Sequence, residues 1–136
     1  MTGTTNATMV GGVINSAGGG GGLPAGTYDI KPEWNGKTLA LWTSVGSYTF
    51  NLTRATSDAL PLGFEVTIVK VSTGNTITFN FGGDDGTVQM YTVKDNKMLK
   101  NGTFTMVKGT VCMCLKLKKI GGGDSSWIAD SNVSFS

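Results

Sequence analysis

The sequence contains no histidine, and that absence removes several classes of site at once. Histidine is the commonest general base, the usual activating partner of a catalytic serine or cysteine, and the commonest zinc ligand. What remains for chemistry is 9 acidic residues, the lysines and 2 cysteines. We therefore expect no catalytic residues, no metal and no cofactor, and we expect that the protein is not an enzyme.

Charged residues are scarce as well. They make up 15% of the 136 residues, against about 25% in ordinary soluble domains. The net charge is +2, and no arginine-rich face accompanies the densest basic stretch, which contains Lys116, Lys118 and Lys119. Lysines that protect a strand edge from pairing with another edge explain such a stretch better than a nucleic-acid interface does. The sequence thus predicts no nucleic-acid binding.

Long apolar runs are also missing. No stretch approaches the roughly 20 apolar residues that a membrane-spanning helix requires. The first residues, Met-Thr-Gly-Thr-Thr-Asn, do not show the basic segment and apolar run that are typical of a secretory signal. We expect no membrane span.

The two cysteines, Cys112 and Cys114, are separated by one residue. On an extended strand their Cα atoms would lie close to the limit of about 7 Å beyond which a disulfide cannot form. Two thiolates without histidine also make a weak metal site. We expect free thiols that pack as small apolar side chains, within the protomer or against a neighbouring subunit.

Glycine is abundant, with 21 residues, and so are threonine, serine and asparagine. These residues suit turns and strand surfaces more than helices. Turn signals recur at intervals of about 8–12 residues, a spacing typical of β-sandwiches and small barrels. The sequence therefore predicts an all-β fold, a single antiparallel β-sandwich or small barrel of the jelly-roll type. Helix is expected only as a single turn near residues 54–58.

The clearest strand patterns are Phe64–Val71 and Thr76–Phe81, joined by turn residues at Ser72–Asn75. This arrangement predicts a β-hairpin. A second pair, Thr103–Lys108 and Thr110–Lys118, is expected to join across a glycine turn. In the first strand the alternation changes phase after Ile68, which indicates a bulge or burial on both faces. The residues predicted to face the core are Val66, Ile68, Ile77, Phe79, Phe81, Val111, Met113, Leu115 and Leu117.

Residues 1–26 differ from the β domain expected over residues 27–136. They carry no charged side chain and contain five consecutive glycines, Gly18–Gly22. Such a segment cannot bury enough apolar surface to fold alone. One interpretation is a disordered tail. The other is a flexible Gly-rich N-terminal arm that orders against a partner, with Val10, Val13 and Ile14 as its docking residues.

Other candidate sites have simpler explanations. Asp84-Asp85-Gly86 lacks the spacing of a calcium-binding EF-hand loop, and turn-forming acids explain it better. Glu33 and Glu65 are two carboxylates of the kind that glycosidases use, but nothing in their spacing supports that role. The three tryptophans and three tyrosines are expected mostly in the core, although two exposed coplanar rings would form a sugar-stacking platform.

Three segments between Leu60 and Asp130 form a recognisable series: LPLGFEVTIVKVSTGNTITF, then GTFTMVKGTVCMCLKL, then GGGDSSWIAD. The series resembles a domain that recurs in virion proteins of tailed bacteriophages, including tail fibres and head decoration proteins. The resemblance implies an all-β module, often trimeric, that serves assembly or adhesion and has no catalytic residues.

From these observations we expect a non-enzymatic phage virion protein, made in the bacterial cytoplasm, that decorates or cements a capsid. Its expected partners are further copies of itself, in a homo-oligomer that is most simply a trimer, and a major capsid protein. One alternative is a tail-fibre or receptor-binding module that contacts host glycans through Gly82–Gly86 and Gly121–Ser126. Another is a lectin-like carbohydrate-binding domain.

Overall fold

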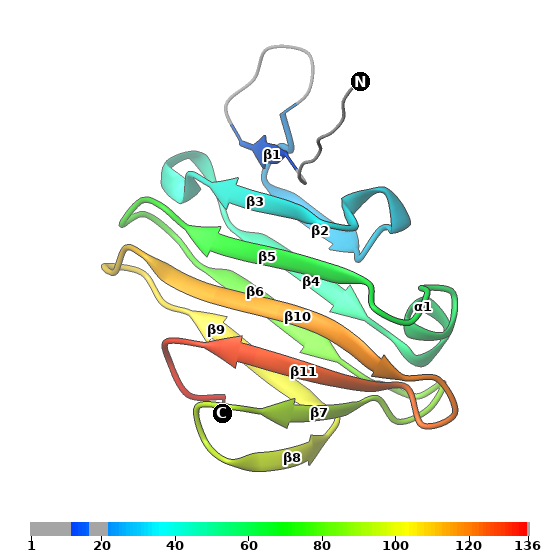
Figure 1. Ribbon diagram of the computed structural model, residues 1–136. Helices are drawn as coiled ribbons and strands as arrows, with labels where there is room; N and C mark the ends of the chain where they lie inside the picture. Colours follow the sequence, from blue (N-terminus) through cyan, green and yellow to red (C-terminus); the bar gives the residue numbers. More distant parts are fainter. Residues whose placement is uncertain (1–11, 17–21, 136) are drawn as a thin grey trace, which may run out of the picture.

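The computed structural model describes residues 12–16 and 22–135 of the chain, which form two β-sheets around one core (Figure 1). The expected all-β class is confirmed. The larger sheet contains, in spatial order, β1 (Val13–Asn15), β3 (Lys37–Leu41), β5 (Glu65–Lys70), β10 (Met113–Gly121), β11 (Ser126–Ser131), β7 (Gln89–Thr92) and β8 (Lys97–Lys100). The smaller sheet contains β2 (Gly26–Asp29), β4 (Tyr48–Leu52), β6 (Ile77–Phe81) and β9 (Gly102–Met106).

Helical structure in the described residues is short. The single α-helix, α1 (Arg54–Asp58), lies where one helical turn was expected. The Thr53 hydroxyl accepts a hydrogen bond from the Thr56 amide and so caps its first turn. Two 3₁₀ turns, Pro32–Trp34 and Thr43–Val45, flank β3. Within residues 12–16 and 22–135, no helix is long and apolar enough to span a membrane.

The strand connections differ from the expected antiparallel arrangement, which is wrong for the first half of the chain. From β1 to β6 successive strands alternate between the two sheets, so neighbours within each sheet run parallel. The pair β7 and β11 is parallel as well. Among the named strands, the antiparallel pairs are β5 with β10, β10 with β11, β7 with β8, and β6 with β9.

Both predicted hairpins are therefore wrong, because each pair of strands is divided between the two sheets. The turn after β5 carries the chain across the core to β6. Asn75, at φ 46°, donates its side-chain amide to the Thr43 carbonyl at 2.7 Å and so fixes this crossing. Local turn residues are the same whether a chain reverses within one sheet or crosses to another, so the sequence pattern does not separate the two cases.

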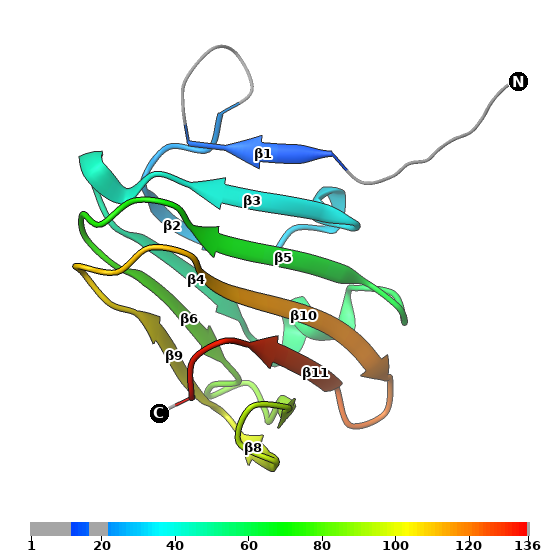
Figure 2. The same cartoon turned by 60° about the vertical axis from the view of Figure 1, so that its left-hand side comes forward.

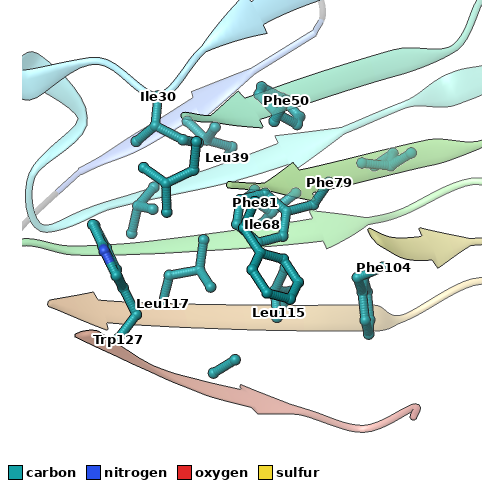
Figure 3. Close-up of a cluster of buried hydrophobic side chains, with 14 of the residues drawn as sticks. Ile30, Leu39, Phe50, Ile68, Phe79, Phe81, Phe104, Leu115, Leu117 and Trp127 are labelled. Atoms are coloured by element: carbon teal, nitrogen blue, oxygen red, sulfur yellow. The ribbon is translucent and has the colours of Figure 1, made fainter. Parts of the chain in front are cut away.

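The core lies between the sheets, and Figure 3 shows side chains from both sheets converging there. All the residues predicted to face the core are buried except Val111, which is 49% exposed. The reason lies in Cys112, whose positive φ of 60° breaks the alternation just before β10 begins at Met113. From Met113 onward the inward residues alternate without interruption.

The four strands of the smaller sheet share a triplet in which an aromatic residue stands between two polar ones. In register across the sheet, the aromatic side chains point inward and the polar ones outward. The rings of Tyr28 and Phe50 stack at 6.0 Å between centroids. The triplets are Thr27-Tyr28-Asp29, Thr49-Phe50-Asn51, Thr78-Phe79-Asn80 and Thr103-Phe104-Thr105.

Two buried lysines end the apolar inward faces of the central strands β5 and β10. Lys70 follows Val66 and Ile68 in the same phase, so β5 has no bulge after Ile68 and its other face is only partly buried; the alternation continues through a lysine. Lys119 ends the inward face of β10 in the same way. Because β5 and β10 are antiparallel, the two lysines lie at opposite ends of the core. Lys70 donates its ammonium group to the carbonyls of Ser72 and Thr110, and so joins two loops at its end.

This burial makes stability depend on pH through Lys70. Burial lowers the pKa of Lys70 from its ordinary value of 10.5. Between the lowered pKa and about 10.5, the unfolded chain binds a proton that the folded protein has released, so stability rises with pH in that interval. We expect urea unfolding to show that the stability of the wild type relative to Lys70→Met increases as pH approaches 10.5. A difference that stays constant or falls would contradict this assignment.

Candidate functional site

The N-terminal docking residues meet the domain at the edge of the larger sheet. β1 lies parallel to β3 and is the outermost strand on that side (Figure 2). Ile14 is partly buried and packs against the core, whereas Val13 is 66% exposed. Val10 lies outside the described residues. The structure thus places two of the three predicted docking residues on an edge strand and gives them different surroundings.

Contacts at both ends of β1 hold it in register. The Thr38 amide donates to the Gly12 carbonyl at 3.1 Å, and the Leu23 amide donates to the Asn15 carbonyl at 2.8 Å. The Ser16 hydroxyl accepts the Trp42 amide at 2.7 Å. Along the outer edge of β1, no strand of the described chain pairs with its backbone. The Asn15 carbonyl on this edge is taken by Leu23, but an edge that no other strand covers is still a template for a strand of another protein.

A groove of about 360 Å³ lies near the opposite edge of the same sheet. It is formed where β7, β8 and β11 meet, and its lining is mostly apolar. The lining residues are Tyr91, Thr92, Val93, Asn96, Lys97, Met98 and Ile128. Met98, Tyr91 and Ile128 are in register across the three strands, so they form one continuous row. Sequence reasoning missed this groove because β11 is far from β7 and β8 along the chain.

A second hollow, of about 290 Å³, lies on the outer surface of β5, β10 and β11 and is lined mainly by polar residue types. Cys114 lines it, together with Lys116 and Asp130. Both cysteines are free, Cys112 exposed and Cys114 partly buried. Burial, and secondarily the charge of Asp130, raises the pKa of the Cys114 thiol.

The two thiols are therefore expected to react at different rates. In the native protein a thiol reagent should modify Cys112 first, because it is exposed, and Cys114 more slowly, because less of it is thiolate. After denaturation without a reductant both should titrate. Mass spectrometry of the partly modified protein identifies the first site. Equal rates, or fewer than two thiols after denaturation, would contradict this expectation.

A polar network at the end of the core near α1 is the part of the structure most similar to a catalytic arrangement. The Trp127 indole donates to the Ser57 hydroxyl at 2.8 Å, which donates to Ser125 at 2.8 Å. Ser125 in turn donates to Asp58. This bond, more than the adjacent Arg54, holds the pKa of Asp58 below its ordinary value.

The polar groups of this network form their hydrogen bonds within the network. Ser57 is fully buried, and its proton is directed to Ser125. Lys119 is 4% exposed, and its ammonium group donates to the carbonyls of Ser57 and Leu60 at 2.7 and 2.8 Å. A nucleophile must be reachable by its substrate and free to transfer its proton. The arrangement is that of a structural network that joins α1 to β10 and β11.

Arg54 connects the two loops that are candidates for glycan contact, Gly82–Gly86 and Gly121–Ser126. Its guanidinium donates to the Thr87 carbonyl at 3.1 Å and to the Gly123 carbonyl at 2.8 Å. Asp85 accepts hydrogen bonds from the amides of Arg54 and Ala55, and these bonds lower the pKa of its carboxyl group. Asp85 therefore binds the start of α1. No sequence pattern indicates this role of Arg54.

The remaining candidates do not come together. Glu65 forms an ion pair with Lys116 at 3.5 Å, as expected for a strand residue that faces solvent. The exposed ring of Trp42 directly follows β3, whereas that of Tyr91 is on β7, and β5, β10 and β11 lie between these two strands. In the described part of the chain, no group of three or more His, Cys, Asp or Glu residues could hold a metal ion.

Comparison of this chain with protein-family models, with curated proteins and with solved structures finds no match.

Proposed function

We propose that this protein is a non-enzymatic structural protein of a phage virion that decorates the capsid. Its β-sandwich domain would dock on the shell through the N-terminal segment. The observation that carries the proposal is the position of β1, an edge strand with one exposed apolar side chain, Val13, and an outer edge with which no strand of the described chain pairs. Such an edge is suited to pairing with a strand of another protein, in which backbone hydrogen bonds supply affinity. The resemblance of residues 60–130 to virion proteins supports the same proposal.

The proposal is tested by measuring attachment to virus particles that lack the protein. A chain without residues 1–22 should lose attachment. Its melting temperature should fall by only about 4 °C or less, because Ile14 is the one apolar side chain of β1 that packs against the core. A chain without residues 1–11 keeps β1 and separates the contribution of Val10 from that of the strand. Undiminished attachment of the chain without residues 1–22 would contradict docking through the N-terminal segment.

The same edges lead us to propose a homo-oligomer, most simply a trimer. β1 and β8 end the larger sheet, and β2 and β9 end the smaller one. Packing around a three-fold axis would cover exposed edges and close the assembly. Light scattering at micromolar protein concentration is expected to give the mass of a trimer. The mass of a monomer would remove this part of the proposal.

A receptor-binding module of a tail fibre is the second candidate, and one observation favours it. The loops at residues 82–86 and 121–126 lie side by side because Arg54 and Asp85 hold both to α1. Paired loops at one end of a rigid β domain are a common position for ligand contacts. Binding of the purified protein to host cells, but not to particles lacking it, would favour this candidate over capsid decoration.

A further inference from the structure

Exposed apolar side chains gather on one part of the outer face of the larger sheet, around the groove between β7, β8 and β11. Tyr91, Val93, Met98 and Ile128 line the groove and are each 36–53% exposed. Ile120 on the neighbouring β10 is 46% exposed. Single exposed apolar residues are common on protein surfaces, but several that line one concave site mark a contact surface.

Lysines surround this apolar surface. Lys97 lines the groove, Lys100 lies two residues beyond Met98 on β8, and Lys118 is in register with Ile128. Lys94 lies in the turn between β7 and β8. Within residues 12–16 and 22–135 none of these four lysines forms an ion pair.

Two acidic residues lie nearby and offset part of this charge. Asp95 accepts a hydrogen bond from the Phe135 amide at 3.0 Å, so its carboxylate also holds the C-terminal segment. Asp130 is exposed two residues along β11 from Ile128, and it is in register with Lys116. The surface around the groove therefore remains positive, with lysines outnumbering the acidic side chains.

The position of β8 indicates how a ligand would approach. β8 is the last strand of the sheet, so its outer backbone edge is unpaired within the described chain. Lys97 and Lys100 on this edge repel the same edge of a second copy, which makes self-pairing through β8 unfavourable. The same charges attract a strand with acidic side chains, and an apolar side chain from such a strand would reach the groove.

We propose that the edge of β8 and the adjoining groove bind an extended acidic segment of another protein, with one large apolar side chain seated against Tyr91, Met98 and Ile128. This surface is separate from the N-terminal edge, because β1 and β8 end opposite sides of the sheet. It adds to capsid docking through β1 and does not depend on it.

The test uses the full-length purified protein and a fluorescent peptide of alternating glutamates and threonines with one central leucine. Fluorescence anisotropy should show binding that weakens about tenfold in the double variant Lys97→Glu/Lys100→Glu. The matched control, Lys31→Glu/Lys108→Glu, has the same net charge but changes lysines away from the groove, and it should bind within about twofold of the wild type. Equal weakening in both double variants would overturn the proposal, because it would show attraction by net charge alone.

A second pair of variants tests the apolar contact. Val93→Ser removes an apolar side chain from the groove lining, whereas Val45→Ser removes one that is 83% exposed beyond β3. Only Val93→Ser should weaken binding of the leucine peptide. Neither Val93→Ser nor Val45→Ser should change binding of a peptide with alanine at the centre. Identical affinities for the leucine and alanine peptides would overturn the proposal. So would binding to vesicles that contain phosphatidylserine without binding to either peptide.

Discussion

Replacing Phe79 with alanine is expected to lower the free energy of unfolding by about 3–5 kcal/mol, the range for truncating a buried phenylalanine. Phe79 is 1% exposed, and its ring stacks with that of Phe81 at 5.9 Å between centroids. It belongs to the inward aromatic row of the smaller sheet, where Phe50 and Phe104 are its register partners. The truncation would leave a cavity between the two sheets, which neighbouring side chains held on strands fill only partly.

The matched control is Thr78→Ala, one residue earlier on β6. Thr78 faces outward and is in register with Thr49 and Thr105. We expect this change to stay within about 0.5 kcal/mol, as for a surface substitution. Urea unfolding of both variants measures the difference. A loss below about 1 kcal/mol for Phe79→Ala would show that β6 presents its other face to the core.

Replacing Lys119 with methionine is expected to destabilise the fold by more than about 2 kcal/mol. Methionine keeps most of the aliphatic volume but cannot donate to the carbonyls of Ser57 and Leu60. An unsatisfied buried polar group costs about 1–3 kcal/mol, and here two would be left at one end of the core. The substitution also removes the side-chain donor through which β10 holds the residues at the end of α1.

Lys118→Met is the control, because this neighbouring lysine is exposed on the outer face of the same strand. It should change stability by no more than about 0.5 kcal/mol. Thermal or urea unfolding compares the two variants with the wild type. If Lys119→Met is as stable as Lys118→Met, the lysine does not make the contacts that hold α1 to the sheet.

The positions of most strands could be predicted from the sequence because period-2 alternation is a local signal. β6, with Ile77, Phe79 and Phe81 buried in turn, is the clearest example. The assignment of strands to sheets could not be predicted, since it depends on where each connection leads. The alternation of β1 to β6 between two sheets leaves no mark that distinguishes it from a series of hairpins.

Two inward-facing positions at strand ends could not be predicted because lysines occupy them. Lys70 and Lys119 occupy inward positions, but lysine ordinarily marks a solvent-facing position. The pattern therefore indicated a phase change after Ile68 where the strand continues unchanged. Val111 was predicted to be buried but is exposed, because the residue types do not reveal the positive φ of Cys112 that breaks the alternation.

Of the candidate binding surfaces, one could be predicted from the sequence and the other could not. Val13 and Ile14 could be chosen from sequence because they form a short apolar patch in a polar, Gly-rich segment. The groove could not be predicted from the sequence, because Ile128 meets Tyr91 and Met98 only when β11 pairs in parallel with β7. Arg54 also acts through contacts distant in sequence, to residues 87 and 123.

The central claim is that this chain docks on a capsid, and imaging of virus particles tests it most directly. Cryo-electron microscopy would compare particles made with and without the protein at the same resolution. Our account predicts that the difference density consists of two-sheet β domains on the outer surface of the shell. It also predicts that this density lies against the shell through the edge that carries β1. Density confined to the tail, or no difference between the two particles, would contradict the account.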